Sequence, residues 1–122
     1  MKKILVVDDD VIFRHLVKEL LENNGYEVHT AKDGVDGLEK LKIEKYDLVI
    51  LDVNMPNLNG FETLSKIRED EELFDIPVIM LTVKAMVNDQ IQGFEYGADE
   101  YLTKPFENDI LLAKVKALLE KE

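Results

Sequence analysis

The strongest constraint on the fold of this chain is a fivefold alternation of short apolar runs with longer amphipathic stretches. The apolar runs cover residues 4–7, 26–30, 48–51, 78–81 and 101–103. In the stretches that follow, apolar side chains recur at the spacing of one helix face: Val17, Leu20 and Leu21; Val35, Leu38 and Leu41; Phe61, Leu64 and Ile67; Val87, Ile91 and Phe94; Leu111, Val115 and Leu118. This alternation predicts an α/β fold in which helices cover both faces of a parallel sheet.

The composition of the runs and the residues between them refine this prediction. Three runs are continuously apolar, as expected of strands buried on both faces, whereas the second run is more polar and suits an edge strand. Asn24 and Gly25 are expected to end the first helix, Asp33 to cap the second, and Gly97 to close the fourth. We expect residues 1–122 to form a single domain, with no effector domain in this chain.

Charge and cysteine content exclude several classes of function. The chain has 26 acidic and 15 basic residues, a formal net charge of -11, so we expect basic partners and no direct binding of nucleic acid. The absence of cysteine excludes disulfides, thiolate metal sites and thiol redox sensing. The apolar run before the first aspartates is too short for a signal sequence or a membrane span. These features predict a cytoplasmic protein without a membrane partner.

Polar residues follow four of the five predicted strands. They are Asp8, Asp9 and Asp10 at the end of the first, Asp52 at the end of the third, Thr82 at the end of the fourth, and Thr103 and Lys104, followed by Pro105, at the end of the fifth. In an open doubly wound sheet, functional groups gather at the carboxyl ends of the strands, near the point where the strand order reverses. We therefore expect these side chains to lie together at one edge of the sheet.

A cluster of carboxylates at this edge requires positive charge. Two carboxylates about 5 Å apart repel by roughly 3 kcal/mol at an effective dielectric constant near 20. A single aspartate after a strand is usually a helix cap, and Asp10 fits that role. For the set, however, Lys104 supplies only one positive charge. A hard divalent cation, Mg²⁺ or Mn²⁺, is the natural complement to oxygen ligands of this kind.

Such a site suits phosphoryl transfer. A cation and a lysine neutralise the phosphoryl oxygens, and a carboxylate serves as the nucleophile that forms an acyl phosphate. Asp52 is the best placed nucleophile because it stands alone after the central third run. Thr82 can donate its hydroxyl to a phosphoryl oxygen, although a threonine at a strand end is equally well explained by its strand preference.

These residues resemble the receiver domains of two-component response regulators over nearly the whole chain. The matching motifs are Ile4-Leu-Val-Val-Asp-Asp-Asp10, Leu51-Asp-Val-Asn-Met-Pro56 with Asn59-Gly60, Leu81-Thr82, and Gly97-Ala-Asp-Glu-Tyr-Leu-Thr-Lys-Pro-Phe106. The resemblance implies a flavodoxin-like (βα)5 fold with strand order 2-1-3-4-5. It also implies that Asp52 accepts phosphate from a sensor histidine kinase or a phosphotransfer protein. The implied ligands of Mg²⁺ are Asp9, Asp52 and the backbone carbonyl of Asn54, with Asp8 acting through metal-bound water.

The resemblance further implies a switch rather than a turnover enzyme. Lys104 would pair first with Asp52 and then with the phosphoryl group, and the Lys104–Pro105 peptide bond would be cis. Thr82 would move toward the phosphoryl group and Tyr101 would turn inward, although a half-buried strand aromatic also explains Tyr101. The fourth helix, fifth strand and fifth helix would then present a changed surface to a downstream effector or output domain.

Some positions depart from the family pattern. Val83 stands where a small residue is common, so access to Asp52 is expected to be narrower. Asn54 and Lys84 are expected to shape the approach of water to the phosphoryl group. Gln92 and Ile110 replace a basic and an acidic residue that support a dimer in winged-helix transcription factors. A weak phosphorylation-dependent dimer is therefore in question, and Ile110 can instead belong to an apolar docking patch.

Three other functions are compatible with parts of the pattern. A haloacid-dehalogenase-like phosphohydrolase also has an aspartate nucleophile after a strand, but its general acid two residues later is Asn54 here. A flavodoxin-like nucleotide binder would need a glycine-rich phosphate loop after the first strand, which is missing. A receiver that serves only as a binding module would not need Asp8, Asp9, Asp52, Thr82 and Lys104 together.

Overall fold

The computed structural model describes residues 1–83 and 97–120, and these form one parallel sheet with helices on both faces. The strands are β1 (Lys3–Val7), β2 (Glu27–Ala31), β3 (Leu48–Asp52), β4 (Val78–Val83) and β5 (Glu100–Lys104). The helices are α1 (Val11–Glu22), α2 (Gly34–Ile43), α3 (Gly60–Glu69) and α5 (Asn108–Leu119). The predicted fourth helix (Val87, Ile91 and Phe94), together with Lys84 and Gln92, lies outside the described residues, as does the side chain of Val83.

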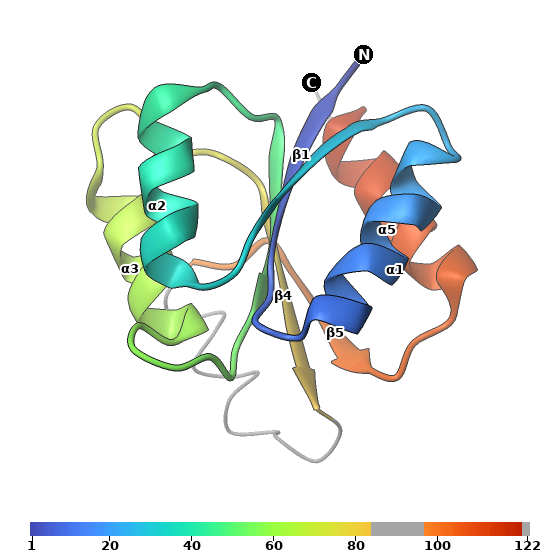
Figure 1. Cartoon of the computed structure of the whole chain (residues 1–122). Helices are drawn as coiled ribbons and strands as arrows, with labels where there is room; N and C mark the ends of the chain where they lie inside the picture. Colours follow the sequence, from blue (N-terminus) through green and yellow to red (C-terminus); the bar gives the residue numbers. More distant parts are fainter. Residues whose placement is uncertain (84–96, 121–122) are drawn as a thin grey trace.

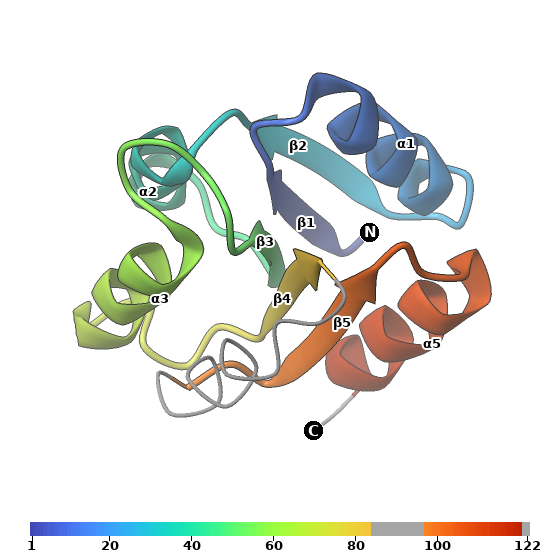
Figure 2. The same ribbon diagram turned by 90° about the horizontal axis from the view of Figure 1, so that it is seen from below.

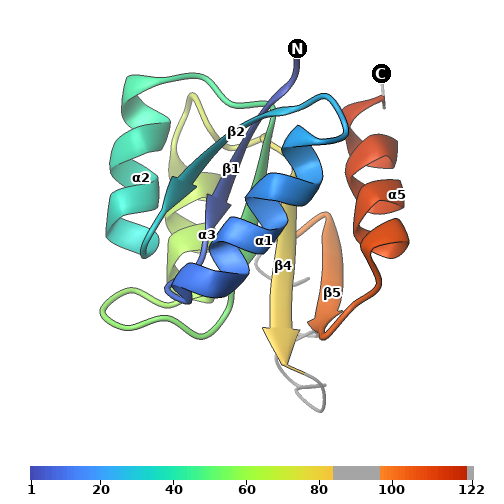
Figure 3. The same cartoon turned by 45° about the vertical axis from the view of Figure 1, so that its right-hand side comes forward.

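The strand order is β2-β1-β3-β4-β5, and every neighbouring pair is parallel. This confirms the predicted doubly wound fold and the edge position of β2. Figure 3 shows that the strands run toward the same end of the sheet, away from the chain termini. The strand order reverses between β1 and β3, so the carboxyl ends of these two strands flank the crevice in which such folds place their functional groups.

Alternate side chains of the buried strands pack on opposite faces. Leu5, Val49 and Met80 belong to the core that α2 and α3 cover, whereas Ile4, Ile50 and Ile79 belong to the core under α1 and α5. Figures 1 and 2 show the two helix pairs on either side of the sheet. Burial on both faces explains why these strands are continuously apolar.

Strand boundaries differ slightly from the predicted ones. The second strand starts at Glu27 rather than Tyr26, because the Glu27 amide donates to the Lys2 carbonyl and Glu27 pairs with Lys3. Asp52 and Lys104 are the last residues of β3 and β5, not the residues after them. Both side chains therefore project from the hydrogen-bonded sheet rather than from loops.

Helix ends agree with the predicted caps. Asp10 caps α1 by accepting from the amides of Ile12 and Phe13, and Asp33 caps α2 by accepting from the Asp36 amide. Gly25, which follows α1, has a positive φ angle, as expected after a helix. Gly97 also has a positive φ, but the helix that it was expected to close lies outside the described residues. Within the described residues, none of the helices combines the length and apolarity needed to traverse a bilayer.

Candidate functional site

Three carboxylates meet at the carboxyl end of the sheet. Asp8 and Asp9 directly follow β1, and Asp52 ends β3. One oxygen from each lies within 4.8 Å of the others, the one such acidic cluster within residues 1–83 and 97–120. Asp8 and Asp52 are buried, whereas Asp9 is exposed. The cluster therefore has a dry inner side and an outer side that opens to solvent.

Asp8 is the most firmly held of the three. Its Oδ1 accepts from the Asp10 amide at 2.9 Å, and its Oδ2 accepts from Lys104 Nζ at 2.9 Å. Its backbone carbonyl accepts from Arg14 Nη1 at 2.7 Å. Both oxygens of the Asp8 carboxylate therefore accept a hydrogen bond, whereas Asp52 is held by the longer contact to Lys104.

Lys104 bridges the two buried carboxylates unequally. Its Nζ lies 2.9 Å from Asp8 Oδ2 and 3.4 Å from Asp52 Oδ1. The sequence-based expectation paired Lys104 with Asp52, whereas the shorter contact is to Asp8. One ammonium group thus pairs with two buried carboxylates, and its ion pair with Asp52 is the weaker of the two.

The electrostatics of Asp52 reflect this shortage of positive charge. Burial, and then the negative charge of Asp8, raise the pKa of Asp52 to about 7 against the opposing effect of Lys104. A carboxyl group with this pKa has an unmet demand for a cation. Together with Asp8 and Asp9 it offers hard oxygen donors that fit Mg²⁺ or Mn²⁺, since such ions bind through one or two carboxylates and keep several waters.

Thr82 lies beside this cluster and has an unsatisfied hydroxyl. In the sheet, Asp52 pairs with Leu81 and Thr82 with Thr103, so the Thr82 backbone is one residue from the register positions of Asp52 and Lys104. Its side chain is fully buried, and Oγ1 has no hydrogen-bond partner among the residues that the structure describes. A buried hydroxyl without a partner is costly, and Oγ1 is therefore available to donate a hydrogen bond.

The loop after β3 is held tightly against Asp52. The Gly60 amide donates to the Val53 carbonyl at 2.9 Å, and a Cβ at Gly60 would lie 2.3 Å from the Asp52 carbonyl oxygen. Only glycine allows this approach. Asn54 lies in the same loop with its side chain exposed. Sequence reasoning quoted Gly60 in a motif but assigned it no role.

The remaining predicted site residues lie on β5 and just after it. Tyr101 is buried and pairs with Met80 in the sheet. The Lys104–Pro105 peptide bond is cis. The structure also reveals a contact that sequence reasoning missed: Lys104 Nζ lies 4.0 Å from the centroid of the Phe13 ring. No sequence signal marks this contact, because the two residues are far apart in the chain.

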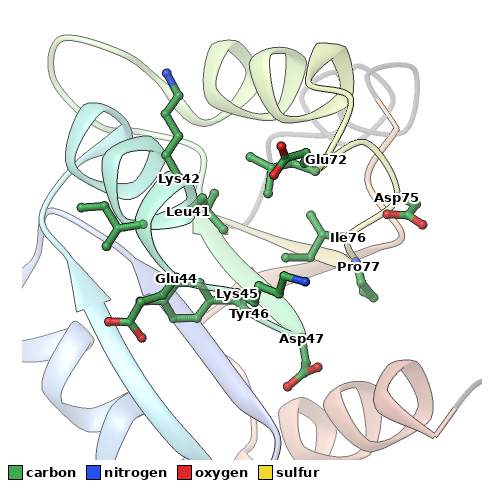
Figure 4. A pocket seen from close by; sticks show the side chains of 12 residues that line it. Leu41, Lys42, Glu44, Lys45, Tyr46, Asp47, Glu72, Asp75, Ile76 and Pro77 are labelled. Atoms are coloured by element: carbon green, nitrogen blue, oxygen red, sulfur yellow. The ribbon is translucent and has the colours of Figure 1, made fainter.

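A pocket of about 750 Å³ lies at the other end of the sheet, where β3 and β4 begin. It is bordered by the end of α2 and by the segments before β3 and β4, with Leu41, Tyr46 and Ile76 among its apolar residues. Figure 4 shows charged side chains such as Lys42 and Asp75 around it. None of the carboxylates of the cluster lines it, so it is not part of the site described above.

The fold and the position of the cluster place this chain among doubly wound α/β proteins that use the carboxyl edge of the sheet. Comparison with known proteins is more specific. A family model described as the response regulator receiver domain matches residues 4–116. The chain belongs to this family, and is therefore a receiver domain of two-component response regulators.

Individual relatives agree. The chain is 45% identical over 121 residues to the DNA-binding dual master transcriptional regulator RpaA of Synechocystis, covering 99% of this chain and 50% of the relative. It is 45% identical over 120 residues to the alkaline phosphatase synthesis transcriptional regulatory protein PhoP of Bacillus subtilis, covering 98% and 49%. The crystallised chemotaxis protein CheY4 of Vibrio cholerae superposes with a TM-score of 0.92 at 37% identity, covering 98% of this chain and 99% of that one. The chain spans about half the length of the two transcriptional regulators, RpaA and PhoP.

Proposed function

We propose that this receiver domain is a phospho-accepting switch in which Asp52 takes a phosphoryl group from a sensor histidine kinase or a phosphotransfer protein. The observation that carries the proposal is the charge balance at Asp52. This buried carboxyl group lies beside Asp8, shares one lysine with it, and has a pKa of about 7. Such a group is poised to bind a cation and an electrophilic phosphorus together.

In the proposed reaction, a carboxylate oxygen of Asp52 attacks phosphorus in line with the bond to the donor. The new P–O bond gives an acyl phosphate, and the donor's nitrogen or oxygen leaves with the electron pair of the broken bond. Lys104 donates N–H bonds to the phosphoryl oxygens, and Thr82 donates its unsatisfied hydroxyl. Because Asp52 reacts as the carboxylate, positive charge that lowers its pKa also generates the nucleophile.

We propose that Asp8, Asp9, Asp52 and the backbone carbonyl of Asn54 hold Mg²⁺ or Mn²⁺. When bound, the ion neutralises charge that builds up on the phosphoryl oxygens. The clustering of three carboxylates with one ammonium group supports this assignment. Asp8 is expected to act through a metal-bound water, since one of its oxygens already accepts from Lys104.

Phosphorylation of Asp52 would also drive the proposed switch. A phosphoryl group adds about -1.5 to -2 charges and strong hydrogen-bond acceptors at Asp52. Thr82 would turn toward it and Tyr101 would repack, which changes the surface of β5, α5 and the fourth helix. We propose that residues 1–122 work as one such unit, and that a downstream effector or output domain reads this surface. The changed surface could also form a phosphorylation-dependent dimer.

The direct test is intact-mass analysis after incubation with acetyl phosphate and Mg²⁺. We expect one phosphoryl adduct per molecule, which decays slowly and does not form in EDTA. Asp52→Asn should abolish the adduct, whereas Asp75→Asn, an equally conservative change at an exposed position, should leave it unchanged. An adduct that persists in Asp52→Asn would refute the assignment. Steady hydrolysis of a phosphomonoester with many turnovers would instead favour a phosphohydrolase.

A further inference from the structure

The ring of Phe13 lies against the ammonium group of Lys104. The Nζ atom is 4.0 Å from the ring centroid, well inside the range of a cation–π contact. The Lys104 side chain is only 17% exposed, so little water competes for its charge. Lys104 therefore has three neighbours: the Asp8 carboxylate, which accepts a hydrogen bond from it, the Asp52 carboxylate at ion-pair distance, and the aromatic face of Phe13.

Phe13 itself is fixed from two sides. Its amide donates to the Asp10 carboxylate at 3.2 Å, which anchors it in the first turn of α1. Its ring meets the ring of Phe106 edge to face, with centroids 5.6 Å apart and planes at 88°. Phe106 comes two residues after Lys104. α1 and the segment after β5 thus close together around the lysine.

We propose that Phe13 is a positioning residue for phosphoryl transfer, because its ring holds the Lys104 ammonium between Asp8 and Asp52. This inference rests on the proposed role of Asp52 as phosphoryl acceptor. Lysine is a point charge on a flexible four-carbon stem, so it needs a neighbour that limits its positions. An aromatic face attracts the charge without accepting a directed hydrogen bond. The N–H groups remain free to pass from Asp52 to phosphoryl oxygens.

If Phe13 acted only by filling space, its replacement by leucine should have little effect on the labelling rate of Asp52. Leucine would fill much of the same space and keep α1 against Phe106, but it has no π face. Tyrosine keeps the face and adds one hydroxyl. If the aromatic face positions Lys104, Phe13→Tyr should label Asp52 at a rate close to that of the wild type, and Phe13→Leu should label it more slowly.

The geometry is testable without any phosphorylation. In EDTA, ring current should move the NMR signals of the Lys104 ε-CH2 protons upfield of those of the other lysines. The shift should persist in Phe13→Tyr and vanish in Phe13→Leu. Unshifted Lys104 signals in the wild type would overturn the inference, whether or not Asp52 accepts phosphate.

The functional effect is measured as the rate of Asp52 labelling by acetyl phosphate, a donor that needs no docked kinase. Phe13→Leu should label about three- to tenfold more slowly, equivalent to about 0.7 to 1.4 kcal/mol. Phe13→Tyr should stay within about twofold of the wild type, and Phe74→Leu, at an exposed site, serves as the matched control. Wild-type rates in Phe13→Leu, or equal slowing in both variants, would overturn the inference. No labelling of the wild type would refute the proposed function instead.

Discussion

The charge balance at Asp52 predicts that Asp52→Asn makes the metal-free protein more stable at alkaline pH. In the folded protein this carboxyl group has a pKa of about 7, compared with an ordinary value of 3.8. Between these values the folded state holds a proton that the unfolded state has lost. By linkage, the free energy of unfolding of the wild type must fall as the pH rises through this window. Asparagine has the same shape and no charge, so the variant should not show this loss.

The size of the effect follows from the shift. A pKa raised from 3.8 to about 7 corresponds to an upper limit of about 4 kcal/mol. The cluster opens to solvent beside the exposed Asp9, and screening there reduces the expected difference to about 1–2 kcal/mol. Asp8 keeps its bond to Lys104 in the variant, so no new buried charge is left unpaired. For a domain of this size the difference corresponds to a rise of about 3–8 °C in melting temperature.

The assay is urea denaturation in EDTA at pH values from about 3.5 to 8, which span the window between the two pKa values, with wild type, Asp52→Asn and the exposed control Asp75→Asn. The wild-type and Asp52→Asn curves should meet below about pH 4, diverge as the pH rises toward 7 and run parallel above it, with Asp52→Asn the more stable. Saturating Mg²⁺ should stabilise the wild type more than the variant and narrow the gap. Parallel pH profiles in EDTA, or a less stable variant at pH 8, would refute the reasoning.

Three further predictions concern neighbouring residues. Thr82→Val should unfold at equal or slightly higher urea concentration, because it removes a buried hydroxyl without a partner in the described residues, yet should slow Asp52 labelling about tenfold. Lys104→Met should also slow labelling by at least about tenfold, but should raise the affinity for Mg²⁺ in calorimetry because the ammonium no longer competes for the carboxylates. Gly60→Ala should lower both stability, by about 2 kcal/mol or more, and labelling, because its Cβ would collide with the Asp52 backbone. The control Gly25→Ala has open space around it and should lower stability alone, by about 1 kcal/mol, since Gly25 has a positive φ.

The sheet and the location of the acidic cluster were predictable because both follow from periodicity. Parallel strands bring their carboxyl ends to one edge, so residue types at the ends of the apolar runs were enough to bring Asp8, Asp52 and Lys104 together. The 96-residue separation of Asp8 and Lys104 in the chain did not matter, because each is placed by its own strand.

Contacts between side chains were not predictable in the same way. The preference of Lys104 for Asp8 over Asp52 depends on a difference between 2.9 and 3.4 Å. The Phe13 ring over Lys104 depends on where α1 starts relative to β5. Arg68 donates to the carbonyls of Gly97, Phe74 and Ile76, although the sequence marks it only as a cation in the last turn of α3. Such contacts follow from packing, which periodicity does not specify.

The unequal sharing of Lys104 also bears on how the site responds to charge. In the described state the ammonium lies nearer to Asp8, so Asp52 is the group whose ionisation is least compensated. In the proposed function, a cation that enters would share oxygens with Lys104, which would limit its affinity. A phosphoryl group would add negative charge next to Asp52 and would draw both Lys104 and the cation toward that side. Asp52 is buried and incompletely neutralised. A cation or phosphoryl group bound there would therefore change the charge balance of the whole cluster. A site in which Lys104 paired fully with Asp52 would be stabilised less by a bound cation or a phosphoryl group.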